Sequence, residues 1–255
     1  MKKELCRTTA FYVPVDAING DRVEFPPAEV HHLREVVRIR SGELVRVLDG
    51  CGACYRVVLE SSPEGSVLVG RVLSVERSEA EKPSISAALA LGRKARSRVA
   101  VEKLAELGCH RIVPLLTEYT SYRGNPAREV EKWLPVCQAA LKQSGNCFLT
   151  GIGVPLTFEE FIGKVNGEDT RPVFCFKDRE PVERKRSRMA LCRCASEYIL
   201  VIGPEGGFST TEQELIEDSG ALRLHLGGAD LRFETAAVAG YILLRESLRR
   251  DLYFY

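Results

Sequence analysis

From Ser84 onward the sequence alternates between apolar strands and helices, and this alternation limits the possible folds more than any other feature. The pattern predicts strands at 85–91, 112–116, 173–176, 198–202 and 222–226, and helices at 96–107, 125–141, 156–162, 209–216 and 235–248, with a kink at Pro135. Chains of this kind form a parallel sheet with helices on both faces. We therefore predict an α/β domain over residues 83–255.

The first 78 residues have a different pattern. Short, Val-rich segments at 8–13, 44–48, 55–59 and 67–75 are bounded by turns such as Asp49-Gly50 and Glu64-Gly65, and one helix is predicted at 27–37. These features predict a small β-barrel or half-barrel over residues 1–78. A polar segment, 79–82, joins it to the α/β domain.

Composition excludes several classes of protein. The chain has 255 residues, of which 45% are hydrophobic, enough for one large domain or two smaller ones. No apolar run approaches the roughly 20 residues that span a bilayer, and Pro14 and Asp16 interrupt the apolar stretch near the N-terminus. We therefore expect a cytoplasmic protein. Because the formal net charge is only +1, RNA binding would depend on local basic clusters.

The chain contains nine cysteines, an odd number that favours free thiols in a reducing compartment. Cys51 and Cys54 could form a four-thiolate zinc site with Cys192 and Cys194 if the fold brought the two pairs together. Cysteine also serves as a small buried apolar residue. We favour that second interpretation and expect no metal.

The strongest local signal is a buried strand that runs into a glycine-rich turn and then a helix. Gly203, Gly206 and Gly207 allow a ligand to approach the backbone closely, while Ser209 and Glu212 fit a capping box. Small molecules bind at the carboxyl ends of parallel strands in α/β proteins. A tight turn before a capped helix explains the pattern equally well. The glycine spacing matches neither the dinucleotide fingerprint nor a Walker loop.

A second strand–glycine–helix junction follows at 222–226, Gly227 and Gly228, ahead of the helix that is predicted from Thr235. That helix carries a stripe of small residues suited to close packing between helices, Ala236, Ala237 and Gly240. A helix-packing motif is the alternative to a binding site. Two such junctions so close together favour the site.

These motifs together resemble the ribosomal RNA small subunit methyltransferase E family, which belongs to the SPOUT class. The matching residues are Gly203-Pro204-Glu205-Gly206-Gly207; Leu226-Gly227, Leu231-Arg232 and Glu234-Thr235-Ala236; Glu106-Leu107-Gly108, Ile112, Pro114 and Thr117-Glu118; Trp133 with Gln143-Ser144; and His31-His32-Leu33, Val37-Arg38, Gly42 and Asp49-Gly50. The resemblance extends over nearly the whole chain.

The resemblance implies a knotted SPOUT methyltransferase domain, with a deep trefoil knot, that follows a PUA-like RNA-binding barrel. It also implies S-adenosylmethionine as cofactor, a homodimer formed through the knot domain, and methylation of a uridine at N3 in 16S ribosomal RNA of the small ribosomal subunit. The expected cofactor-binding residues are Ile202, Gly203, Glu205, Gly206, Gly207, Leu226, Gly227, Leu231 and Thr235.

The chemistry requires no covalent nucleophile, because a sulfonium methyl is already activated. The protein must align N3 with the methyl carbon, help the N3 proton to leave, and stabilise negative charge on the uracil oxygens. Arg232 and Glu234 are the catalytic candidates, with an ordered water as the alternative to Glu234. A carboxylate at a helix start also interacts favourably with the helix dipole, which is the structural alternative for Glu234.

Basic residues form three clusters that could contact phosphate: Arg34, Arg38 and Arg40; Arg93, Lys94, Arg96 and Arg98; and Arg184, Lys185, Arg186 and Arg188. A solvated surface is the alternative for each, and we favour it for the third. The predicted RNA-binding residues are His31, Arg34, Arg38, Arg93 and Arg123. Tyr119 and Tyr122, with Arg123, are candidates to contact an extruded base.

Several positions depart from the family pattern. Ala229 stands where the family has Arg and is followed by Asp230, Gln138 replaces Glu, Asn146 replaces Arg, and Arg93 replaces Lys. These changes are compatible with a relocated ion-pair network, with another RNA site as substrate, or with a catalytically silent RNA-binding or ribosome-assembly protein. The glycines at both junctions favour a working cofactor pocket.

Overall fold

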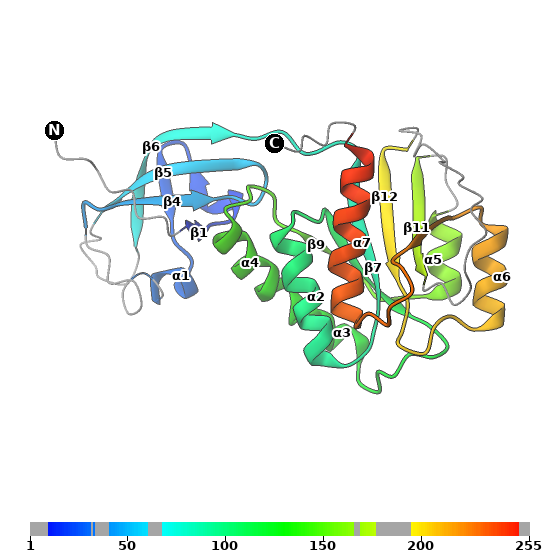
Figure 1. Ribbon diagram of the computed structural model, residues 1–255. Helices are drawn as coiled ribbons and strands as arrows, with labels where there is room; N and C mark the ends of the chain where they lie inside the picture. The colour runs from blue at the N-terminus through cyan, green and yellow to red at the C-terminus, as the bar shows by residue number, and fades with distance from the viewer. Residues whose placement is uncertain are drawn as a thin grey trace. The chain divides into compact units, whose positions relative to one another are not determined.

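The computed structural model describes residues 10–31, 33, 41–60, 68–165, 169–176 and 195–249. The chain divides into two compact units, the first formed by Met1–Ala80 with Cys137–Leu149 and the second by Glu81–Val136 with Thr150–Tyr255 (Figure 1). The sequence pattern places 137–149 in the second domain, whereas the structure groups this segment with the first. Two contacts explain the difference: Leu141 packs with Ala10 and Leu48, and Lys142 lies 2.6 Å from Glu29.

The first unit contains a six-stranded sheet. Its strands, in spatial order, are β1 (Ala10–Tyr12), β4 (Leu44–Leu48), β5 (Ala53–Glu60), β6 (Val69–Arg77), β3 (Arg22–Glu24) and β2 (Ile18–Asn19). All neighbours are antiparallel except β1 and β4. Alternate side chains of the strands, such as Val45 and Val47, are fully buried in one apolar core. A 3-10 turn (η1, Val15–Ala17), helix α1 (Pro27–His31) and the larger part of helix α4 (Trp133–Ser144), from Cys137 on, also belong to this unit.

The second unit is built on a parallel sheet. Its order is β10 (Leu156–Thr157), β8 (Arg111–Leu116), β7 (Ser84–Ala90), β12 (Glu197–Ile202), β11 (Thr170–Phe176) and β13 (Leu222–His225), with β9 (Gly151–Ile152) paired to β8. Each of these pairings is parallel. The predicted α/β architecture with a parallel sheet is therefore confirmed.

Helices cover both faces of this sheet. The helices of this unit are α2 (Lys94–Glu106), α3 (Pro126–Val130), α5 (Phe158–Val165), α6 (Thr210–Asp218) and α7 (Phe233–Leu248), and α4 begins in it at Trp133. On β12, Ile199 and Val201 pack in the same apolar cluster as residues of α5, whereas Leu200, between them, lies against Gly240 of α7. Because successive strand residues point to opposite faces, α5 and α7 lie on opposite sides of the sheet.

Two predicted helices differ from those observed. The helix predicted at 156–162 begins at Phe158, because Leu156–Thr157 pairs with β8 as a short strand, and Thr157 and Glu160 cap the helix reciprocally. The kinked helix predicted at 125–141 is two helices, α3 and α4. Pro135 lies in the first turn of α4, where its missing N–H is not needed for a helical hydrogen bond.

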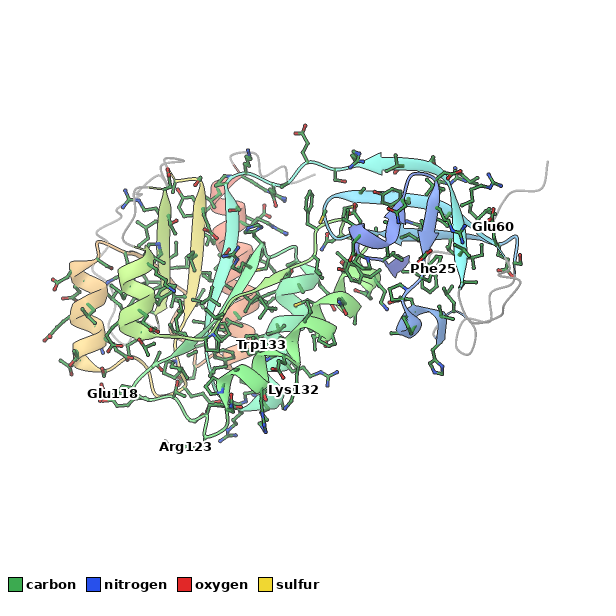
Figure 2. All side chains as sticks on the ribbon, turned by 180° about the vertical axis from the view of Figure 1, so that it is seen from behind. Phe25, Glu60, Glu118, Arg123, Lys132 and Trp133 are labelled. Carbon is green, nitrogen blue, oxygen red and sulfur yellow. The ribbon has the colours of Figure 1, made fainter. Side chains whose placement is uncertain are left out.

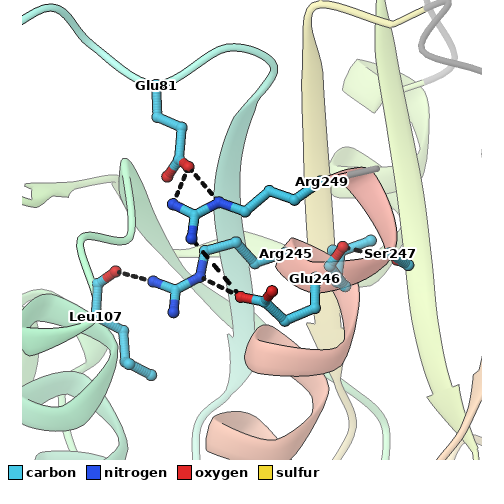
Figure 3. A network of polar contacts seen from close by, with 7 residues as sticks. Glu81, Leu107, Arg245, Glu246, Ser247 and Arg249 are labelled. Atoms are coloured by element: carbon cyan, nitrogen blue, oxygen red, sulfur yellow. Dashed lines mark hydrogen bonds and ion pairs between the residues drawn. The ribbon is translucent and has the colours of Figure 1, made fainter. Parts of the chain in front are cut away.

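A polar network fixes the carboxyl end of α7 (Figure 3). Arg249 donates hydrogen bonds to Glu81, which belongs to the polar joint before β7. Arg245 donates to the backbone oxygen of Leu107, at the end of α2, at 3.1 Å, and also pairs with Glu246. Exposed ion pairs stabilise a fold only slightly. Loss of a single exposed pair should therefore disturb α7 little; the opposite end of this helix forms part of the site described next.

Candidate functional site

A cavity of about 750 Å³ lies at the carboxyl ends of the parallel strands of the second unit. Its walls come from both glycine junctions, from β11 and from the first turn of α2. The lining residues are Arg96, Cys175, Phe176, Ile202, Gly203, Pro204, Glu205, Gly206, Gly207, Phe208, Gln213, Leu226, Gly227, Ala229, Asp230, Leu231, Arg232, Phe233 and Ala236. The position agrees with the rule that α/β proteins bind ligands beyond the carboxyl ends of their strands.

The first junction connects β12 to α6, and its glycines are needed for two different reasons. A Cβ atom at Gly203 would lie 2.8 Å from the ring of Phe208, which is buried against Phe158 and Phe174 with ring centroids 5.5 Å apart in each pair. Gly207 has a φ of +79°, which residues with a side chain rarely adopt. The aromatic core therefore leaves no room for a side chain at Gly203, and the backbone conformation at Gly207 disfavours one.

The N-terminus of α6 is capped by two neighbouring residues, Ser209 and Glu212. The Ser209 hydroxyl accepts the N–H of Glu212 at 3.3 Å, and the Glu212 carboxylate accepts the N–H of Ser209 at 2.9 Å. The predicted capping box is thus confirmed. The second oxygen of Glu212 accepts the N–H of Glu118 at 2.9 Å, so the same buried carboxylate also holds the loop that follows β8.

The second junction connects β13 to α7 and is more open. Gly227 has a φ of +88°, and a Cβ atom there would meet nothing within 4 Å. The N-cap residue of α7 is Arg232, whose side chain makes no capping hydrogen bond. This helix start therefore borders the cavity without a side-chain cap of its own.

Charged groups of both signs line the cavity. Arg96 forms an ion pair with Glu205 of the first junction, while Arg232 and Asp230 come from the second. Arg96 thus lies at the cavity, although the sequence suggested only an RNA-binding cluster for it. Burial raises the pKa of the Cys175 thiol to about 12. The thiol therefore stays protonated near neutral pH and is not poised as a nucleophile.

Most of the predicted cofactor-binding residues lie together at this cavity. Those that line it are Ile202, Gly203, Glu205, Gly206, Gly207, Leu226, Gly227 and Leu231. Thr235 does not line it and is exposed on α7. Of the two catalytic candidates, Arg232 lines the cavity and Glu234 does not. The Oε2 atom of Glu234 is buried and has no hydrogen-bond partner among the described residues.

The part of the cavity wall that comes from β11 was not predicted from the sequence. Cys175 and Phe176 end this strand, which lies between β12 and β13 in the sheet. The rule that ligands bind at carboxyl strand ends could have found them once the strand order was known. Of the departures from the family pattern, Ala229 and Asp230 line the cavity, whereas Gln138 and Asn146 lie in 137–149 of the first unit.

The described RNA-binding candidates are exposed. His31 lies at the end of α1 in the first unit. In the second unit, Arg93 is the N-cap of α2, and Arg123 projects from the loop before α3 (Figure 2). Other basic candidates, Arg34, Arg38, Arg40 and the cluster at 184–188, lie outside the described residues.

The cysteines give no metal site in the described part of the chain. Cys51 is exposed and Cys54 is buried, while Cys192 and Cys194 lie outside the described residues. Among the residues that the structure describes, no three His, Cys, Asp or Glu side chains are grouped to hold a metal ion. Nor does any helix in those ranges combine the length and apolarity needed to cross a membrane.

Comparison with known proteins defines the class first. A family model described as "RNA methyltransferase domain" matches residues 79–245. A relative from Synechocystis, "Ribosomal RNA small subunit methyltransferase E", is 30% identical over 219 residues, which cover 84% of this chain and 69% of that protein. A relative of the same name from Mycobacterium bovis is 27% identical over 89% of this chain and 87% of its own. The chain belongs to the ribosomal RNA small subunit methyltransferase E family, as its motifs indicated.

Solved structures agree with this assignment. A Legionella pneumophila protein described as a methyltransferase, in complex with S-adenosylmethionine, is 27% identical and superposes with a TM-score of 0.78 over 94% of this chain and 98% of its own. The family member from Neisseria gonorrhoeae, also bound to S-adenosylmethionine, is 23% identical with a TM-score of 0.79, over 93% and 97% of the two chains. At 23% identity, the likeness to the Neisseria gonorrhoeae structure is evidence for the fold alone.

Proposed function

We propose that this protein binds S-adenosylmethionine and methylates N3 of a uridine in 16S ribosomal RNA of the small ribosomal subunit. Family membership supports RNA methylation in general. The observation that carries the proposal is the cavity that both glycine junctions form together at the carboxyl ends of β12 and β13.

The cavity residues fit this cofactor. A volume of about 750 Å³ lies within the range of small-molecule sites. The backbone at Gly227 is open to close approach, and the carboxylate of Asp230 suits a positively charged ligand. Ile202, Phe176 and other apolar residues would surround an adenine ring. Bound S-adenosylmethionine would supply a methyl group already activated by a sulfonium.

Arg232 is our proposed catalytic residue. It lines the cavity at the uncapped start of α7, so its guanidinium and the positive end of the helix dipole can both stabilise negative charge on the uracil oxygens. Arg96 is already paired with Glu205, which suits it to holding the loop. Since Glu234 does not line the cavity, a role for it is indirect, and an ordered water is the better acceptor of the N3 proton.

We propose further that the second unit carries the SPOUT trefoil knot and that the first is a PUA-like barrel that binds RNA. The largely antiparallel sheet of the first unit supports this division, as does the absence of a strand–glycine–helix junction from its described residues. Replacing Arg34, Arg38 and Arg40 together with Gln should weaken RNA binding and reduce the magnitude of its salt slope by about 2 to 3. Cofactor affinity should remain unchanged. An unchanged RNA salt slope would contradict the assignment.

A homodimer formed through the second unit is also proposed, though on different residues from those the sequence suggested. Ala237 and Gly240 of the small-residue stripe are buried within the subunit, where Gly240 lies against Cys175 and Leu200. The outer face of α7 instead exposes Leu243 (49%), an apolar surface that can be covered by a second copy. The molar mass measured by light scattering at micromolar concentration should be that of a dimer, and the mass of a monomer would contradict the proposed homodimer.

The direct test maps methylated nucleotides in small-subunit rRNA from cells with and without this protein by mass spectrometry. Loss of one N3-methyluridine, restored by the wild-type gene and not by the Arg232→Ala variant, is expected. Loss of a methyl group elsewhere would indicate a methyltransferase for another RNA site. An unchanged map would favour the catalytically silent RNA-binding or assembly protein. A cytoplasmic location remains a prediction.

A further inference from the structure

An exposed aromatic ring stands at the rim of the cavity. Tyr119 lies in the loop that follows β8, and 51% of its surface is exposed. A Cβ atom built on Gly206 would lie 3.3 Å from the Cβ of Tyr119 and 3.7–3.8 Å from two of its ring carbons. Gly206 lines the cavity, whereas Tyr119 does not. The ring therefore stands next to the cofactor loop but outside the volume that a cofactor would fill.

The backbone on both sides of Tyr119 is held in place. The N–H of Glu118 donates to the buried Glu212 carboxylate at 2.9 Å, and the N–H of Thr117 donates to the hydroxyl of Thr120 at 3.2 Å. Glu212 also caps α6 at the end of the first junction. One carboxylate thus ties the backbone next to Tyr119 to the end of the cofactor loop, and Figure 2 shows Glu118 on the loop that carries Tyr119.

The second tyrosine of the loop is arranged differently. The Tyr122 hydroxyl donates to the backbone oxygen of Asn125 at 3.1 Å. Its ring fills the space that a Cβ atom at Gly124 would need, so it packs on its own loop. Tyr122 is therefore a structural residue, and Tyr119 is the one of the two that offers a ring face beside the cavity.

We propose that Tyr119 is the stacking platform for the target uracil once that base is out of the RNA stack. This inference rests on the proposed function. An unstacked base binds readily to an aromatic side chain, and a tyrosine ring is ordered at low entropic cost. A base stacked on Tyr119 would lie at the rim of the cavity that holds the cofactor. The contact requires the aromatic face and not the hydroxyl.

The test measures methyl transfer from labelled S-adenosylmethionine to small ribosomal subunits isolated from cells that lack the protein. Tyr119→Ala and Tyr119→Leu should lower kcat/KM for the subunits by between about 5-fold and about 150-fold, the range for loss of base–aromatic stacking. Tyr119→Phe should remain within about two-fold of wild type. Tyr122→Phe serves as the matched control in the same loop, and calorimetry should give the same cofactor affinity for all variants.

The outcomes separate the two proposals. If the wild-type protein transfers no methyl group, the proposed function fails and the platform fails with it. If the wild type is active and Tyr119→Leu matches it, only the platform is overturned. Equal losses in Tyr119→Phe and Tyr119→Ala would also overturn it, because the hydroxyl and not the ring would then be responsible. Thermal unfolding of each variant excludes a loss caused by misfolding.

Discussion

The two glycine junctions of the second unit line the same cavity but end in different ways. At the first, Ser209 and Glu212 close the start of α6 with reciprocal hydrogen bonds. At the second, Arg232 occupies the N-cap of α7 and its side chain makes no such bond. In both junctions a strand precedes a glycine-rich turn, so the two sequences follow the same pattern. The two helix starts nevertheless differ in their capping hydrogen bonds.

The difference indicates a division of roles between the junctions. A helix start presents backbone N–H groups without helical partners, together with a partial positive charge. Where a capping box satisfies them, as at Ser209, the loop serves as a rigid wall. Where the cap makes no such bond, as at Arg232, the helix end remains able to interact with negative charge that develops on a substrate. We therefore propose that the first junction forms a rigid wall of the cofactor site, whereas the second contacts the cofactor at Gly227 and faces the reacting base at Arg232.

The largest effect is expected for Arg232→Ala. Loss of one preorganised group that stabilises developing negative charge lowers kcat by about 100-fold to 1,000-fold in other enzymes, and we expect the same here. Cofactor affinity should change little, because the glycine loops of both junctions remain. Arg249→Ala, at the opposite end of α7, is the control and should keep kcat near wild type. Unchanged kcat in Arg232→Ala would remove the assigned role.

Gly227→Ala should have the next largest effect. Gly227 and Gly220 have φ values of +88° and +62°, and a Cβ atom at either meets nothing within 4 Å. Replacement of either glycine with alanine should therefore lower the free energy of unfolding by a similar amount, about 1–2 kcal/mol, through backbone strain alone. Only Gly227 lines the cavity, so only Gly227→Ala should weaken cofactor binding, by about tenfold in calorimetric titration. Equal affinity in both variants would show that the second junction does not contact the cofactor.

The signals that the sequence predicted correctly at this site are local ones. The glycines of the first junction and the pairing of Ser209 with Glu212 depend on neighbours a few residues away, so spacing alone is sufficient. The contributions of Arg96 and Phe176 depend on which strands and helices lie side by side. That order, β12-β11-β13, is not encoded in any short segment.

The position of the start of α7 explains why two predicted residues lie away from the cavity. The helix begins at Phe233 and not at Thr235, so Glu234 and Thr235 belong to its first turn. Successive helix residues point about 100° apart, since there are about 3.6 residues per turn. Phe233 and Ala236, three positions apart, therefore face the cavity together, while Thr235 points elsewhere.

A smaller effect is expected for Ser209→Ala, which removes the cap of the first junction. Loss of such a cap should lower the free energy of unfolding by about 1 kcal/mol. If the first junction is a rigid wall, cofactor affinity should remain within about two-fold. Thr157→Ala, at the capped start of α5, is the matched control and should destabilise by a similar amount in denaturant titration. A large loss of cofactor affinity in Ser209→Ala alone would mean that the cap supports binding directly.

The smallest effect concerns the thiol of Cys175, on the strand between the two junctions. Burial raises the pKa of Cys175 and of Cys137 from 9.0 to about 12, so at pH 8 only about one molecule in ten thousand carries the reactive thiolate at either position. Exposed Cys51 should therefore be alkylated by iodoacetamide much faster than both, as peptide mass spectrometry would measure.

The raised pKa of Cys175 also fixes how the free energy of unfolding depends on pH. Because folding favours the protonated thiol, Cys175 contributes a constant amount to stability below pH 9. As the pH rises from about 9 to 12 the unfolded chain loses this proton first, so the stability of the folded state falls. Cys175 lines the cavity, whereas Cys137 lies in the first unit. S-adenosylmethionine should slow alkylation of Cys175 further and leave Cys137 unaffected. Equal protection of both thiols would point to general stabilisation, and rapid alkylation of Cys175 in the free protein would mean that the cavity between the junctions is open to solvent.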